Sequence, residues 1–359
     1  MVFVTGGTGL LGAHLLYYLS RAGYKILALK RKTSSIVEVE RTFDLLVNIH
    51  SENGTPANQL LKNIEWIDGD ILDIFSLEDA FSNNIDQVYH CAGFVSYDSI
   101  HKEKLLDINV QGTANIVNAC LEHNIKKLGF VSSIAALSRT KNGEAINESN
   151  DWKESPLNTN YAISKYNGEL EVWRGAAEGL DTVIINPSVI IGFGNWTNSS
   201  NIIIQKAWEE FRFYTEGLNG FVDARDVAKC MIQLMESEIV NERFIITEGN
   251  YTTKYILQSF AEHLHKQKPT IKVNKLIAEF GWRMIAIRDY FKGSNSIFTK
   301  EAARAAFYKS SYSNEKVTSA IKYQFTPMPQ TIREVSQGLL NYQDQWEEIR
   351  ASAKVKSSG

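Results

Sequence analysis

The stretch TGGTGLLG, which spans Thr5–Gly12, lies between a short apolar run and an amphipathic segment. Glycine loses more backbone freedom on folding than any other residue, so this density of glycine indicates that something approaches the backbone closely. Between a strand and a helix, glycines allow a tight turn, and the free amides and the helix dipole attract a phosphate. A glycine turn that binds no ligand is the alternative, so the meaning of the stretch depends on residues further along the chain.

The length and composition are those of an ordinary globular protein with more than one part. A chain of 359 residues exceeds the size that a single core usually reaches, which predicts a large domain with a smaller one attached. The net charge of −3 provides no basic surplus for a phosphate backbone, so we expect no nucleic-acid partner.

Cysteine usage and hydropathy predict a cytoplasmic protein. Cys91, Cys120 and Cys230 are widely spaced and form no CxxC pair, so neither a disulfide framework nor a metal site is expected. Nothing at the N-terminus resembles a signal peptide, and no apolar run is long enough to cross a bilayer, so no integral membrane segment is expected.

Short β-branched runs alternate with helical patterns over residues 1–190. The runs predicted as strands are VFVT (2–5), KILALK (25–30), IEWID (64–68), DQVYHC (86–91), KLGFVSS (127–133) and TVIINPS (182–188). Strands separated by helix-length segments imply right-handed crossovers and a parallel sheet. The predicted fold class is therefore α/β, a doubly wound parallel sheet of the Rossmann type.

The remaining sequence predicts a smaller, mainly helical substrate domain over the carboxyl edge of the sheet, where open α/β sheets bind ligands. Residues 191–219 and 249–350 are assigned to it, residues 220–248 return to the first domain, and residues 351–359 form a tail. The segment Lys275–Lys292 has an apolar face with basic ends. This face either packs on the core or lines the substrate pocket, or it docks on a membrane surface.

Tyr161 and Lys165 lie four residues apart, which places a phenol and an ammonium on one face of a helix. Such a pair alone is common by chance. Here it is combined with Ser132 and Ser133 at the end of a predicted strand and with an N-terminal glycine loop. That combination indicates a catalytic site rather than a solvated helix face.

With these pieces in place, the sequence resembles the extended branch of the short-chain dehydrogenase/reductase superfamily over about its first two thirds. The matching segments are Thr5–Gly12, GDILD with Asp70, DQVYHCAG up to Gly93, INVQGTAN with Asn109, VSSIAA with Ser133, YAISK with Tyr161 and Lys165, and INPSVIIG. Within the branch, FVSSIAAL, NGFVDARDVA and YSNEK are similar to the dihydroflavonol reductase and 3β-hydroxysteroid dehydrogenase group.

The resemblance implies a role for each of four catalytic candidates. Tyr161 is the proton donor in reduction, and the Lys165 ammonium, together with the oxidised cofactor, is expected to lower the pKa of its phenol. Lys165 also holds the nicotinamide ribose. Ser133, rather than Ser132, bonds the substrate oxygen where charge develops. Asn109 holds the active-site region in place through a backbone or water contact.

The resemblance also implies a set of cofactor contacts, in which Asp70 accepts from the adenine amino group and Ile71 packs beside it. They are Thr5, Gly6, Gly9, Leu10, Leu11, Gly12, Arg31, Lys32, Asp70, Ile71, Ala92, Gly93, Lys165, Pro187 and Ser188. After the second strand, proteins that bind NAD carry an acid for the ribose hydroxyl, whereas this chain reads Lys30-Arg31-Lys32-Thr33-Ser34. Three cations and two hydroxyls suit a 2′-phosphate, so NADP is favoured over NAD.

The favoured function is an NADPH-dependent reductase for a ketone or aldehyde of a fairly apolar small molecule. A nucleotide-sugar epimerase with tightly bound NAD is the first alternative, but Asn219 and Gly220 occupy the place where such epimerases carry a diphosphate-binding Arg. Dehydratase chemistry is not expected, because Ile134 and Ala135 replace its acid and base. A non-catalytic NADP-sensing protein is the second alternative. Members of the resembled family often form homodimers, and a homodimer is compatible with this sequence.

Overall fold

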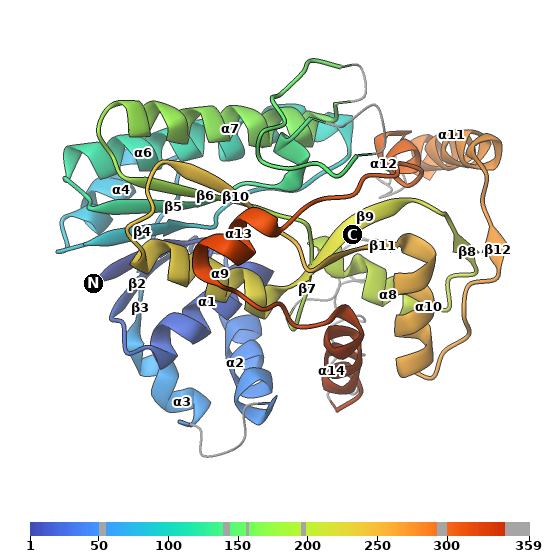
Figure 1. The fold of residues 1–359 in the computed structure, drawn as a ribbon, viewed down its shortest axis with the longest axis horizontal. Helices are drawn as coiled ribbons and strands as arrows, with labels where there is room; N and C mark the ends of the chain where they lie inside the picture. Colours follow the sequence, from blue (N-terminus) through green and yellow to red (C-terminus); the bar gives the residue numbers. More distant parts are fainter. Residues whose placement is uncertain (50–54, 139–143, 156–157, 195–198, 293–299, 342–359) are drawn as a thin grey trace.

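A seven-stranded parallel sheet forms the centre of the protein (Figure 1). The computed structural model describes residues 1–49, 55–138, 144–155, 158–194, 199–292 and 300–341, so the predicted tail lies outside the described residues. The strand order is β10-β6-β5-β4-β1-β2-β3. The strands are β1 (Val2–Thr5), β2 (Ile26–Lys30), β3 (Ile64–Asp68), β4 (Gln87–His90), β5 (Lys127–Val131), β6 (Thr182–Pro187) and β10 (Glu242–Ile246). The predicted doubly wound fold is confirmed.

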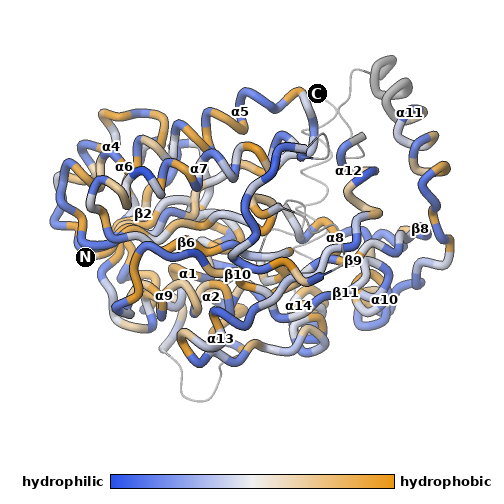
Figure 2. The backbone as a smooth tube through the Cα atoms, turned by 45° about the horizontal axis from the view of Figure 1, so that its top comes forward, coloured by the Kyte–Doolittle hydropathy of each residue, from blue (hydrophilic) through white to orange (hydrophobic). Residues whose placement is uncertain are grey.

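Helices cover both faces of this sheet, and each face has its own hydrophobic core (Figure 1). One face carries α1 (Leu10–Arg21), α2 (Val37–Ile49) and α9 (Ala224–Glu236), and the other carries α4 (Ile74–Phe81), α6 (Gly112–Glu122) and α7 (Asn160–Ala177). Successive residues of β1 point to opposite cores, since Val2 and Val4 belong to one cluster and Phe3 to the other. Both faces are covered, which explains why the inner strands are mostly apolar (Figure 2), whereas the edge strands β3 and β10 carry charged residues.

Short turns of helix complete the first part of the chain. They are α3 (Ala57–Leu60), α5 (Lys102–Leu106), a π-helical turn (Asp107–Gln111) and 3-10 turns at Leu61–Asn63, Ser99–His101 and Ile134–Ala136. The π-helical turn contains the predicted site residue Asn109, and such turns often occur at functional sites.

The chain leaves the central sheet after β6, returns for β10, and builds a smaller region beside the carboxyl edge. This region contains the strands β7 (Val189–Ile191), β8 (Phe213–Tyr214), β9 (Leu218–Asp223), β11 (Gly249–Thr252) and β12 (Ile271–Lys272). Its helices are a 3-10 turn (Ser199–Asn201), α8 (Ile202–Trp208), α10 (Thr253–His263), α11 (Lys275–Lys292), α12 (Lys300–Ala305) and α14 (Met328–Asn341). Helix α13 (Glu315–Ile321) instead packs beside α9 and β10. The β7-β9-β11 sheet and α13 were not expected from the sequence.

Helix α11 presents apolar side chains to solvent in its described part. Leu276 is 80% exposed and Phe280 is 68% exposed. Of the two arrangements left open by the sequence, burial of this face on the core therefore does not hold for these residues. Among the described residues, no helix is both long and apolar enough to cross a membrane.

Candidate active site

The glycine loop is built so tightly that side chains would not fit in it. Gly6 has φ of 71°, and a Cβ there would lie 2.5 Å from the backbone nitrogen of Ala92. A Cβ at Gly12 would lie 2.1 Å from the carbonyl oxygen of Gly6. The loop closes through a 3.0 Å hydrogen bond from the Gly9 amide to the Gly6 carbonyl, and α1 begins at Leu10. This close-packed bare backbone at a helix N-terminus fits the pyrophosphate of a dinucleotide.

A buried chain of hydrogen bonds connects the start of this loop to the end of β4 and to Asn109. Thr5 Oγ1 lies 2.6 Å from His90 Nδ1 and accepts from the Ala92 amide at 3.2 Å. His90 Nε2 lies 3.1 Å from Thr113 Oγ1, which donates to the Asn109 carbonyl at 2.8 Å. Burial, aided by the charge of Lys165, lowers the pKa of His90 to about 3. His90 is therefore a neutral structural link and does not exchange protons at neutral pH.

Asn109 joins two segments that carry predicted site residues. Its side-chain nitrogen donates to the Phe94 carbonyl and to Ser164 Oγ, both at 2.9 Å, and its oxygen accepts from the Phe94 amide at 2.7 Å. Phe94 directly follows the predicted cofactor residues Ala92 and Gly93. The buried Asn109 thus links the loop after β4, through the Phe94 backbone, to α7, through the Ser164 hydroxyl.

Ser133 and Tyr161 are hydrogen-bonded to each other at the carboxyl end of β5. Ser133 also accepts from the Ala135 amide at 3.1 Å, and Thr159 caps the first turn of α7, where Tyr161 lies. The Tyr161 ring packs edge-on against Tyr97, with ring centroids 5.9 Å apart. Two predicted catalytic hydroxyl groups are therefore in direct contact within a largely buried site.

The pKa of Tyr161 differs from the sequence expectation. Burial raises the pKa of this phenol, with a smaller contribution from Tyr97, and the hydrogen bond from Ser133 only partly opposes the rise. Lys165 is not among the causes, and the predicted lowering by its ammonium together with the oxidised cofactor stays a prediction. The sequence shows that the two residues share a helix face, but it does not show how deeply the phenol is buried.

Lys165 is held at the centre of the site. Its Nζ donates to the Val131 carbonyl at 2.9 Å and lies 5.2 Å from the centroid of the Phe130 ring. A Cβ at Gly93 would lie 3.1 Å from the same nitrogen, so Gly93 gives the ammonium room. Burial lowers the pKa of Lys165 to about 8, whereas Cys91 and Glu169 raise it. Lys165 is consequently mostly an ammonium at neutral pH, because its pKa stays slightly above neutral.

Comparison with known proteins identifies the family. A model of the NAD dependent epimerase/dehydratase family matches residues 2–246. The chain belongs to this family. Its members are NAD(P)-dependent enzymes of the oxidoreductase type, so the protein is an enzyme of this class.

Curated relatives of this family member include several reductases. The chain is 29% identical over 274 residues to "Sterol demethylase protein B" of Methylococcus capsulatus, covering 75% of this chain and 76% of the relative. It is 32% identical over 231 residues to a provisionally named dihydroflavonol 4-reductase of Synechocystis sp., covering 63% and 60%. It is 28% identical over 259 residues to cinnamoyl-CoA reductase 1 of Petunia hybrida, covering 69% and 73%.

Solved structures share the fold at lower identity. The crystal structure of gox2253 matches with a TM-score of 0.76 and 22% identity, covering 95% of this chain and 98% of that chain. The UDP-glucose 4-epimerase of Thermus thermophilus, solved in complex with NAD, matches with a TM-score of 0.68 and 20% identity, covering 94% and 98%. These likenesses agree with the Rossmann architecture of the family.

One of the basic side chains at the end of β2 already forms an ion pair within the protein. Lys30 Nζ donates to Asp68 Oδ1 at the end of the neighbouring strand β3. Arg31 and Lys32 are exposed, and the Ser34 amide donates to the Arg31 carbonyl at 2.8 Å. The prediction that three cations face a 2′-phosphate therefore needs correction, because the Asp68 carboxylate already pairs with one of them.

The predicted adenine end lies in a turn after β3. Asp70 Oδ1 accepts from the Leu72 amide at 3.0 Å, which closes a local turn, and Asp73 caps α4. Ile71 is buried, and its carbonyl accepts from Asn115 Nδ2 at 2.9 Å. The structure therefore gives Asp70 a turn-forming bond, and its contact with adenine stays a prediction.

The segment after β6 faces the small β7-β9-β11 sheet. The Ser188 amide donates to the Ile246 carbonyl at 3.0 Å, directly after Pro187 ends β6. In the described structure, Ser188 Oγ is buried and has no hydrogen-bond partner. A buried hydroxyl of this kind beside the carboxyl edge of the sheet is suited to bind a ligand group.

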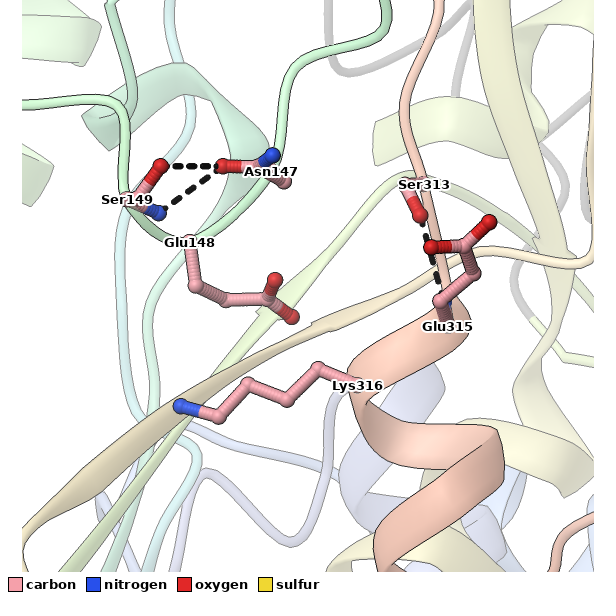
Figure 3. A pocket seen from close by; sticks show the side chains of 6 residues that line it. All are labelled: Asn147, Glu148, Ser149, Ser313, Glu315 and Lys316. Atoms are coloured by element: carbon pink, nitrogen blue, oxygen red, sulfur yellow. Dashed lines mark hydrogen bonds between the residues drawn. The ribbon is translucent and has the colours of Figure 1, made fainter.

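An open pocket of about 450 Å³ lies elsewhere, between the loop at residues 147–149 and the start of α13 (Figure 3). Glu148 approaches it from the loop and Lys316 from the helix. Lys316 Nζ pairs with Glu242 at 2.6 Å and donates to the Arg243 carbonyl at 2.9 Å. The side chains that line this pocket include none of the predicted site residues, so the pocket is separate from the candidate active site.

Proposed function

We propose that the protein is an NADPH-dependent oxidoreductase that reduces the carbonyl group of a fairly apolar small molecule. The observation that carries the proposal is the hydrogen-bonded pair Ser133–Tyr161, with the Lys165 ammonium on the same helix as Tyr161 and the glycine loop at the same edge of the sheet. Relatives named as reductases support the direction of the reaction.

Each side chain has a defined task in this reaction. The bound nicotinamide supplies the hydride. Tyr161 donates its proton to the substrate oxygen, where negative charge develops, and Ser133 donates a second hydrogen bond to the same oxygen. A phenol with a raised pKa is fully protonated at neutral pH, so Tyr161 is ready to act as the acid in reduction. Lys165 stabilises the phenolate that remains and binds the ribose.

The region beside Gly220 argues against a nucleotide sugar as substrate. A Cβ at Gly220 would lie 2.7 Å from Thr247 Oγ1 and 2.8 Å from Ser188 Cβ, so no side chain fits there. The neighbouring Asn219 side chain accepts from the Gly220 amide at 3.0 Å. Neither position offers a cationic fork for a diphosphate. This favours an apolar carbonyl substrate over the epimerase alternative.

Thermal-shift titration tests the cofactor and the substrate class together. A ligand that binds only the folded protein raises its melting temperature. We expect a rise with NADPH and NADP⁺, a smaller one with NADH, and none with UDP-sugars; ketones and aldehydes are then screened by loss of nicotinamide absorbance. A rise with NADH and a UDP-sugar would replace the reductase with the epimerase, and NADPH binding without any turnover would favour the sensing protein.

Replacing Arg31 by alanine is expected to weaken NADPH binding by about 10- to 150-fold while leaving NADH almost unaffected, because a charge-assisted bond to the 2′-phosphate is worth roughly 1.5–3 kcal/mol. Fluorescence titration of both cofactors measures the ratio. Lys25→Ala, at the opposite end of β2, is the control for a general loss of positive charge. An equal loss for the two cofactors would remove Arg31 from the 2′-phosphate site.

A further inference from the structure

Glu169 is a buried carboxylate that the proposed reaction does not use. It lies on α7, four residues after Lys165 and eight after Tyr161, and only 1% of it is exposed. Carboxylates are almost never buried so deeply unless they are paired and hydrogen-bonded. The hydrogen-bond partners of Glu169 therefore indicate its role.

Four side chains from four different elements converge on this carboxylate. Oε2 accepts from Ser132 Oγ at 2.8 Å and from Asn186 Nδ2 at 3.0 Å. Oε1 accepts from Arg243 Nη1 at 3.1 Å and from Trp173 Nε1 at 3.4 Å. Glu169 is thus bonded to the end of β5, to β6, to β10 and to its own helix, which fixes its position relative to the sheet.

Two of these partners continue to the catalytic serine. Asn186 Nδ2, which bonds Glu169, also donates to the carbonyl oxygen of Ser133 at 3.0 Å. Ser132, the other partner, precedes Ser133 in the chain. The backbone on both sides of the Ser133 side chain is therefore tied to one carboxylate.

Arg243 is itself anchored, so its charge stays beside Glu169. Its Nε and Nη2 donate to the Glu148 carbonyl at 3.0 Å and 2.7 Å. The Glu148 side chain in turn accepts from the Ile245 amide of β10 at 2.8 Å; Figure 3 shows it reaching toward that strand. Glu148 belongs to the segment between Ser133 and Tyr161, so the ion pair also secures the connection between the two catalytic residues.

Glu169 and Lys165 lie four residues apart on α7 and bond adjacent residues at the end of β5: Lys165 Nζ donates to the Val131 carbonyl, and Glu169 Oε2 accepts from Ser132 Oγ. The carboxylate and the ammonium are thus held on neighbouring residues, which favours the charged form of Lys165. Besides Glu169, the groups facing the ammonium are the Val131 carbonyl, the Phe130 ring, the neutral His90 and the Cys91 thiol. Burial raises the pKa of Cys91 to about 12, so this thiol carries no charge at neutral pH. Cys91 is therefore not the charged partner of the ammonium, which leaves Glu169, the carboxylate that is ion-paired with Arg243.

We propose that Glu169 is a positioning residue of the active site, which provides the negative charge beside Lys165 and, through Ser132 and Asn186, holds the backbone of Ser133. The Arg243 guanidinium, which pairs with Glu169, partly neutralises the charge of this carboxylate. The inference rests on the proposed function, because the tasks of Lys165 and Ser133 belong to it.

The affinity for NADPH as a function of pH tests the proposal. Lys165 contacts the cofactor as an ammonium, so affinity should fall as the pH rises through its pKa. Glu169→Gln keeps the size of the side chain but removes the charge that favours the ammonium, so the fall should move to lower pH by about 1 unit. Arg243→Gln leaves the carboxylate less neutralised, so the fall should move to higher pH.

Opposite shifts of the pH midpoint for NADPH affinity in the Glu169 and Arg243 variants distinguish this role from a merely structural one. A loss of packing would not move the two midpoints in different directions. Glu171→Gln, on the same helix and paired with the half-exposed Arg174, should leave the midpoint unchanged. Melting temperatures establish that each variant is folded. Unchanged midpoints in folded Glu169 and Arg243 variants would overturn the proposal alone, whereas a wild-type protein that binds no nicotinamide cofactor would overturn the proposed function and this inference with it.

Discussion

The Tyr161→Phe variant is expected to lose turnover by a factor of about 10² to 10⁴ while its NADPH affinity stays nearly intact. The change removes one hydroxyl group and leaves the ring, so packing against Tyr97 is retained. Without the hydroxyl, the group that gives its proton to the substrate oxygen in the proposed reaction is lost. The loss should therefore appear in kcat, measured by nicotinamide absorbance, and not in the cofactor Kd, measured by fluorescence.

The same helix provides the control for this variant. Tyr166→Phe removes a hydroxyl from a ring that stacks on Trp152, with centroids 4.5 Å apart. Tyr166 lies outside the Ser133–Tyr161 pair, so its variant should keep wild-type turnover. Full activity in Tyr161→Phe would show that another group supplies the proton and would remove Tyr161 from the mechanism.

The architecture and the order of the site residues could be predicted because their signals are local. The alternation of short apolar runs with helical segments determines the seven-stranded sheet, and the Tyr161–Lys165 spacing places both groups on one helix face. The glycine loop could be predicted because the steric demand on Gly12 is local, a Cβ there lying 2.1 Å from the Gly6 carbonyl oxygen. The contact between Gly6 and the distant Ala92 could not be predicted.

Features that depend on distant parts of the chain could not be predicted. Lys30 pairs with Asp68, which is 38 residues away on the neighbouring strand. The short strands of the β7-β9-β11 sheet have too few residues to show a periodicity, and they form because they find partners in the folded chain. The pKa of Tyr161 depends on burial by other elements in the same way.

The role of Glu169 could be predicted only in part. Its spacing from Lys165 repeats the four-residue interval from Tyr161, so the sequence does place all three side chains on one face of α7. The same spacing describes many solvated helices, however. What distinguishes Glu169 is Arg243, which lies 74 residues away and becomes a neighbour only when β10 joins β6. A buried ion pair between distant elements leaves no local pattern.

The second large effect is expected for stability, in the Asp223→Ala variant. Asp223 and Arg225 form a buried ion pair in which Nη2 lies 2.6 Å from Oδ2, and Thr331 of α14 donates to the same carboxylate at 2.8 Å. Removing the carboxylate leaves the buried guanidinium with only its bond to Glu334. Breaking a buried pair from one side typically destabilises a protein by about 3–5 kcal/mol. Denaturant unfolding measures the loss.

The exposed pair Glu216–Lys272 provides the comparison, since its side chains are 46% and 55% exposed and Glu216→Ala should have little effect on unfolding. The pH dependence gives a further check. Burial would raise the pKa of Asp223, but Arg225 and Thr331 hold it below its usual value. The stabilisation is then present above the unfolded pKa and is lost as the pH falls through the lower folded pKa. The stability gap between wild type and Asp223→Ala should therefore narrow in acid, and a gap that widens would mean that Asp223 is protonated in the folded state.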